Sequence, residues 1–70
     1  MTAKEMFEKL GFKEINDLIF RFDNGKQWYE IRFWVQGKYW AFNTNCSTII
    51  DFQLTKAINQ QIKELGWYEE

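Results

Sequence analysis

The chain has 70 residues, of which 46% are hydrophobic, 27% charged and 20% aromatic, a composition that fits one small folded domain (residues 1–70) and excludes a disordered chain. Nine basic and ten acidic residues give a net charge of −1, which argues against a protein that binds nucleic acid nonspecifically through its phosphates. The chain has one cysteine and no histidine, which excludes an intramolecular disulfide and a histidine-ligated metal, so we expect no metal and no cofactor. We expect buried aromatic rings to stabilise the domain instead.

The N-terminal segment is predicted to form a short helix over residues 3–10. A Thr-x-x-Glu capping box precedes it at residues 2–5, and apolar residues recur at helical spacing. Gly11 supplies the left-handed conformation that ends such a helix, and Phe12 is placed to pack back on Phe7.

The apolar residues then alternate, which predicts a meander of three antiparallel strands between residues 18 and 42. Asn-Gly within residues 23–26 is a strong signal for a two-residue hairpin turn, and Gly37 within residues 35–38 indicates a second turn. Two-residue loops would place Phe20 opposite Tyr29 and Leu18 opposite Ile31 in the first hairpin, and Phe33 opposite Trp40 and Ile31 opposite Phe42 in the second.

This register is tested by the sequence itself, because a slip by one residue would exchange the two faces of the sheet. It collects almost wholly apolar residues on one face, which is the predicted core face: Leu18, Phe20, Phe22, Tyr29, Ile31, Phe33, Val35, Trp40 and Phe42. The opposite face, called the outer face below, is mixed: Ile19, Arg21, Trp28, Glu30, Arg32, Trp34, Tyr39 and Ala41.

A second helix is predicted from about residue 52 to 65, with Asp51 as N-cap or with an earlier start at Ser47 or Thr48. Gly66 ends it, and Trp67 is expected to pack back on Ile62. The turn-rich residues 43–50 before it are expected to form a loop, with a short fourth strand near residues 47–50 as the alternative. The predicted fold is α+β, a two-layer sandwich of order α-β-β-β-α in which two helices cover one face of the three-stranded meander.

The candidate binding surface is the outer face, because aromatic residues interleaved with arginines have the composition of protein-binding hot spots. In the predicted register Arg21 lies opposite Trp28, and Trp34 lies opposite Tyr39. The alternative is that these pairs only stabilise a thin sheet, and that residues 43–50 or the C-terminal tail cover them. The candidate site residues are Arg21, Trp28, Arg32, Trp34 and Tyr39.

The expected partner is another protein or a second copy of the chain, because the net charge disfavours nucleic acid. A single-stranded nucleic-acid-binding module that stacks bases on the same rings is the alternative. The element order resembles that of double-stranded RNA-binding domains, which hold phosphates with a basic cluster at the start of the second helix. The corresponding residues 51–61 have Lys56 as their only cation, so we do not expect that mode.

An enzyme is not expected. No glycine-rich phosphate loop and no metal-ligand spacing occurs, and the carboxylates form no recognisable acid/base pair. Cys46 has no histidine or basic cluster beside it that would activate its thiol. A free cysteine, no export signal and no apolar run near 18 residues predict a cytoplasmic protein without a membrane span.

Both ends of the chain, MTAKEMFEKLGF (1–12) and LTKAINQQIKELGW (54–67), resemble a group of short uncharacterised proteins encoded by Gram-positive bacteria and their phages. Members open with MTA-EMFE-LG and close with KAIN-QI-ELGW around a divergent, aromatic-rich middle. The resemblance implies a phage or prophage origin. It transfers no catalytic or binding residue, because the group has no established activity and most of the shared positions are those assigned to capping and core packing.

Overall fold

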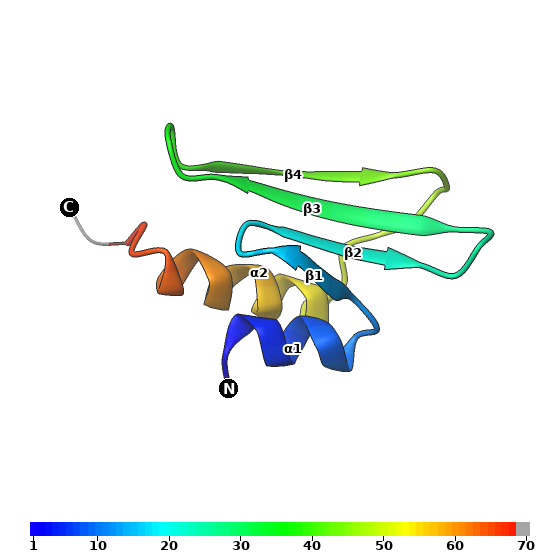
Figure 1. Cartoon of the computed structure of the whole chain (residues 1–70), viewed down its shortest axis with the longest axis horizontal. Coiled ribbons are helices and arrows are strands. Elements are labelled where there is room, and N and C mark those ends of the chain that lie inside the picture. The colour runs from blue at the N-terminus through cyan, green and yellow to red at the C-terminus, as the bar shows by residue number, and fades with distance from the viewer. Residues whose placement is uncertain (69–70) are drawn as a thin grey trace.

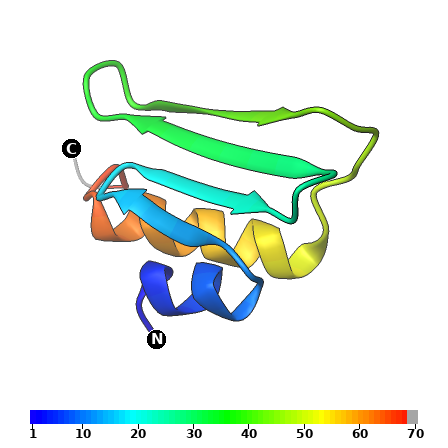
Figure 2. The same cartoon turned by 45° about the vertical axis from the view of Figure 1, so that its right-hand side comes forward.

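The structure, a computed structural model that describes residues 1–68, is an α+β fold with two helices on one face of a four-stranded antiparallel sheet. The strands follow one another in the order β1-β2-β3-β4, so the sheet is a meander with β1 and β4 at its edges. Figure 1 and Figure 2 show the helices side by side nearest β1, with β4 at the far edge of the sheet. The elements are α1 (Ala3–Lys9), β1 (Lys13–Asn16), β2 (Ile19–Asp23), β3 (Trp28–Trp34), β4 (Tyr39–Thr44) and α2 (Phe52–Glu64).

Both ends of α1 follow the prediction. The Thr2 hydroxyl accepts a hydrogen bond from the Glu5 N–H, and the Glu5 carboxylate accepts one from the Thr2 N–H, which completes the capping box. Gly11 has a φ of +92°, and the Phe12 N–H donates to the Phe7 carbonyl at 3.0 Å. The predicted contact is confirmed, since the two phenylalanine rings meet edge to face at 5.5 Å.

Helix α2 repeats this arrangement. Asp51 is the N-cap and accepts from the Leu54 N–H at 2.8 Å, so the earlier start at Ser47 or Thr48 is wrong. At the other end the Trp67 N–H donates to the Ile62 carbonyl at 3.1 Å. The Glu64 carboxylate also accepts from the Ala3 N–H at 2.6 Å, which ties the end of α2 to the start of α1.

The fourth strand is β1, and it was not predicted. Residues 47–50, the expected place for a fourth strand, form no strand. Strand β1 escapes a sequence reading because it is short and polar, and its one apolar residue, Ile15, is 57% exposed. A tight turn at residues 17–18 joins it to β2, where the Asn16 side chain accepts from the Leu18 N–H at 2.8 Å in place of the usual glycine or proline signal. The ladder is irregular between Glu14 and Asn16.

The register of the first hairpin differs from the prediction by two residues. Phe20 lies opposite Ile31, and Tyr29 lies opposite Phe22. The Asn24 side chain accepts from the N–H groups of Lys26 and Gln27. The pair of residues that closes the loop therefore lies one position further along the chain on each strand than predicted. Among these loop residues only Gly25 has a positive φ, which excludes the expected turn with two left-handed residues. Because the shift is even, every side chain keeps its predicted face.

The second hairpin has the predicted register, with Phe33 opposite Trp40 and Ile31 opposite Phe42. Gly37 and Lys38 both take left-handed conformations in its turn. Val35 was predicted to join the core, and this is wrong. It lies in the turn beyond the end of β3 and is 52% exposed.

The core lies between the sheet and the helices. Phe7 stacks on Phe20 with their ring centroids 4.2 Å apart, and Phe33 meets Trp67 edge to face. Apart from the exposed Val35 and the buried Ile31, the rest of the predicted core face is half-buried and packs against this core: Leu18, Phe22, Tyr29, Trp40 and Phe42. The buried apolar residues are Ala3, Phe7, Phe12, Phe20, Ile31, Phe33, Leu54, Ala57 and Ile58.

Candidate functional site

The outer face of the sheet points away from both helices, as predicted. No helix, strand or loop among residues 1–68 covers it. Residues 48 and 49 lie between the layers on the helix side, and the Tyr68 hydroxyl donates to the Asn59 side chain of α2 at 3.3 Å. Neither segment that was expected as a possible cover therefore lies over the outer face, although residues 69 and 70 of the tail lie outside the described residues.

One end of the outer face carries a stacked aromatic pair. Trp34, the last residue of β3, lies opposite Tyr39, the first of β4, as predicted. Their ring centroids are 4.9 Å apart with an interplanar angle of 12°. Trp34 is 37% and Tyr39 53% exposed, so the pair presents aromatic surface to solvent while it stabilises the hairpin end.

The other end holds Arg21 and Trp28, but they are not directly opposite each other. The shifted register places Arg21 opposite Glu30 and Asp23 opposite Trp28. Arg21 still reaches the indole diagonally, with its guanidinium carbon 4.6 Å from the ring centroid. Trp28 is partly buried under this cation, so its surface is less available to a partner than that of Trp34 or Tyr39.

Glu30 connects the arginines of the candidate site. Its carboxylate accepts from Arg21 Nη1 at 3.1 Å and from Arg32 Nε, and its side chain is only 13% exposed. The hydrogen bond from Arg32, followed by that from Arg21, outweighs the effect of partial burial and holds the pKa of Glu30 below its usual value. Both arginines are therefore partly neutralised within the protein.

The five predicted residues thus form two groups rather than one patch. Trp28 and Trp34 are six residues apart on one strand, about 20 Å, and the Arg21–Glu30–Arg32 cluster lies between them. Lys13 extends the face next to Arg21, its partner in the ladder, and was missed because β1 was missed.

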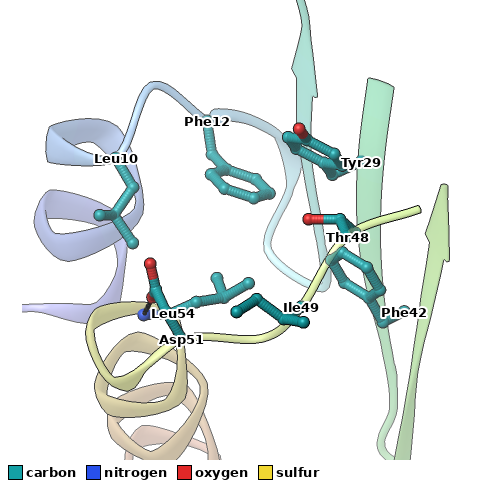
Figure 3. Close-up of a pocket in the computed structure, with 8 residues that line it drawn as sticks. All are labelled: Leu10, Phe12, Tyr29, Phe42, Thr48, Ile49, Asp51 and Leu54. Atoms are coloured by element: carbon teal, nitrogen blue, oxygen red, sulfur yellow. Dashed lines mark hydrogen bonds between the residues drawn. The ribbon is translucent and has the colours of Figure 1, made fainter. Parts of the chain in front are cut away.

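Apart from the outer face, a hollow opens between the two layers (Figure 3). It has a volume of about 220 Å³, and its side chains point into it from the end of α1, the start of α2 and strands β3 and β4. Its rim includes Ile49, which is 82% exposed, and Asp51, whose carboxylate already caps α2. The lining residues are Leu10, Phe12, Tyr29, Phe42, Thr48, Ile49, Asp51 and Leu54.

Within residues 1–68 no group of three or more His, Cys, Asp or Glu side chains is placed to hold a metal ion, and no helix has the length and apolarity to cross a membrane. The Cys46 thiol is partly buried, 3.3 Å from the Thr44 hydroxyl. Comparison of the chain with protein-family models, with curated proteins and with solved structures found no match.

Proposed function

We propose that this protein is a non-enzymatic interaction module that binds another protein with its outer sheet face, centred on the Trp34–Tyr39 pair. The observation that carries the proposal is this stacked pair, exposed on a sheet face that no described element covers. Two large rings held rigid by each other lose little conformational entropy on binding, which is why aromatic residues dominate protein-binding hot spots. The resemblance of the chain ends to phage proteins supports a phage or prophage origin for the module.

The partner surface we propose is apolar at its centre and acidic around it. The outer face carries Lys13, Arg21 and Arg32 against Asp23 and Glu30, a net charge of +1. The hairpin loops at its two ends add Lys26 and Lys38, which brings the charge around the face to +3. Carboxylates that flank an apolar centre would complement this arrangement, and the attraction would be screened by salt.

A protein partner is favoured over single-stranded nucleic acid by the same geometry. A stacking platform for bases needs cations free to follow the phosphates. Here Arg21 and Arg32 share the carboxylate of Glu30, and Arg21 also lies over Trp28. The aromatic groups are also at opposite ends of the face, so successive bases would find no continuous row of rings.

A photo-crosslinking experiment tests the proposal. Benzoylphenylalanine replaces Tyr39 in one variant and Phe52 in the other, since both side chains are exposed, at 53% and 72%, on different sides of the molecule. After irradiation in a lysate of the source cells, we expect protein crosslinks from position 39 that are absent from position 52 and decrease at 0.5 M salt. The same crosslinks from both positions would contradict the proposal. Crosslinks from position 39 to nucleic acid, with quenching of tryptophan fluorescence by mixed single-stranded DNA at low salt, would establish the alternative.

A further inference from the structure

We infer that β4 is a self-association edge, at which two copies of this chain pair their β4 strands antiparallel and form one eight-stranded sheet. Strand β4 lies at the edge of the meander, so one side of its backbone has no strand beside it among the described residues. The inference does not depend on the proposed binding at the outer face.

The hydrogen bonds of the sheet determine which backbone groups of β4 point outward. The Phe33 N–H donates to the Leu18 carbonyl at 2.8 Å, so the backbone of Phe33 faces β2. In an antiparallel ladder, two opposite residues either bond to each other or both point away. Trp40 lies opposite Phe33, so its N–H and carbonyl point to the free edge. By alternation, those of Phe42 and Thr44 point there as well.

The two edges of the sheet are protected to very different degrees. Folded proteins prevent edge-to-edge pairing with charged side chains, prolines, bulges or short strands. The β1 edge has Lys13, Glu14, an irregular ladder and only four residues. The β4 edge has none of these devices, since it is six residues long and regular. Residues 39–50 contain no charged residue at all.

The outward groups of two copies match when the pairing is centred on Phe42. Each Phe42 then lies opposite the Phe42 of the second copy, and each Trp40 lies opposite Thr44 of the second copy. Phe42 and Trp40 are only half-buried at the edge of the core face, because the helices lie nearer β1 (Figure 2). The pairing would bury these rings and extend the stack of Tyr29 on Phe42, whose centroids are 6.1 Å apart.

Charge disfavours the two symmetric face-to-face arrangements of two copies and leaves the edge pairing unopposed. The outer face and its hairpin loops carry +3, whereas the remaining charges of residues 1–68, six acidic and four basic on the helix side and the β1–β2 turn, give −2. Two outer faces or two helix layers packed against each other would therefore bring like charges together. Edge pairing avoids both contacts and places no charged residue of one β4 strand opposite another. It also joins the two outer faces into one continuous surface.

Chemical synthesis gives the sharpest test, because Cys46 allows residues 1–45 and 46–70 to be made separately and ligated. N-methylation of Phe42 removes one outward N–H and blocks the edge, yet it keeps every side chain and leaves the β3–β4 hydrogen bonds intact. N-methylation of Glu14 is the matched control. Arg21 faces β1 and pairs with Lys13, so the backbone of Glu14 points to the other free edge. Circular dichroism verifies that both analogues fold.

In sedimentation equilibrium we expect the unmodified chain and the Glu14 analogue to dimerise at about 50 µM, and the Phe42 analogue to have a dissociation constant at least about 100-fold higher. Equal dissociation constants for the Phe42 analogue and the unmodified chain would overturn the inference, as would a monomeric unmodified chain at about 1 mM.

Amide exchange of the unmodified chain is an independent check. The N–H groups of Trp40 and Phe42 should exchange at least about tenfold more slowly at 1 mM than at 10 µM, and rates that do not depend on concentration would overturn the inference too.

Discussion

At the scale of single residues, Glu30 explains how the outer face accommodates two arginines on adjacent strands, Arg21 on β2 and Arg32 on β3. Its carboxylate lies between Arg21 and Arg32 and is largely shielded from water. Sequence patterning places Glu30 on the outer face but gives no sign of this role. The contact with Arg21 arises from the shifted register, and the contact with Arg32 depends on side-chain rotamers.

Glu30→Gln should lower the free energy of unfolding by roughly 1–2 kcal/mol at pH 7, because two arginines lose their shared counterion. The pKa of Glu30 is lowered in the folded protein, chiefly by the hydrogen bond from Arg32, so its ionised form stabilises the fold above the unfolded-state pKa. This stabilisation is lost as the pH falls through the lower, folded-state pKa. Urea unfolding from pH 7 to pH 3 should therefore show the two proteins converging. The pKa of Glu5 is lowered as well, by its capping hydrogen bonds with Thr2, but this contribution cancels in the comparison. A difference that stays constant with pH would show that the charge of Glu30 is not the cause.

At the scale of elements, side-chain hydrogen bonds in the loops determine how the strands are joined. Asn45 closes the end of the β3–β4 pair, where its side-chain oxygen accepts from the Trp28 N–H at 2.9 Å and its nitrogen donates to the Lys26 carbonyl at 3.1 Å. Asn45 therefore connects the loop before β3 to the segment after β4. This bridge also fixes the position of Trp28 at its end of the outer face.

Asn45→Ala should lower the free energy of unfolding by about 1–2 kcal/mol, because two hydrogen bonds are lost and the Trp28 N–H loses its protein partner. Asn43→Ala is the matched control. Asn43 is an exposed residue of β4, two positions earlier, whose side chain makes no recorded hydrogen bond within residues 1–68, so its effect should stay within about 0.5 kcal/mol. Urea midpoints measure both, and equal midpoints for the two variants would contradict the role of Asn45.

The same side-chain hydrogen bonds limit how much of the sheet follows from the sequence. Caps, glycines and apolar periodicity predicted both helices, the second hairpin and the faces of the central strands, because these signals act between near neighbours. The first hairpin was misplaced because Asn24 bonds the N–H groups of Lys26 and Gln27 instead of adopting a left-handed conformation. Strand β1 was missed because it contributes no buried apolar side chain, and its pairing depends on β2 rather than on its own sequence.

The same limit applies to the candidate site. Trp34 and Tyr39 were placed together because Gly37 fixes their hairpin. Trp28 was predicted to belong to the same patch, although its separation of six residues from Trp34 along one strand corresponds to about 20 Å. The predicted Arg21–Trp28 pair forms, but the shifted register makes it diagonal, with the guanidinium over the ring.

At the scale of the whole molecule, stability depends on a few aromatic rings between two thin layers. A domain of this size has a free energy of unfolding of roughly 4–10 kcal/mol. Phe7 is fully buried, contacts the rings of Phe12 and Phe20, and joins α1 to the sheet. The loss of this one ring therefore removes a large fraction of the total free energy of unfolding.

Phe7→Ala should cost about 3–5 kcal/mol and leave much of the protein unfolded at 37 °C. Phe52→Ala is the control of equal chemistry, since Phe52 is 72% exposed at the start of α2 and its loss should cost no more than about 0.5–1 kcal/mol. Thermal unfolding followed by circular dichroism measures both. A cooperative transition of Phe7→Ala close to that of the wild type would mean that the core is not organised around this ring.

The central claim is that the exposed Trp34–Tyr39 pair binds a protein partner and does more than stabilise its hairpin. The most direct measurement compares the variants Trp34→Ala and Phe52→Ala. Immobilised wild type and the two variants are incubated with a lysate of the source cells, and the recovered proteins are quantified by mass spectrometry. Trp34→Ala should cost only about 0.5–1.5 kcal/mol of stability, so it remains folded. We predict that Trp34→Ala recovers the partner proteins in amounts at least about tenfold lower than the wild type does, while Phe52→Ala recovers the same amounts as the wild type. Equal recovery by Trp34→Ala and the wild type would contradict the claim.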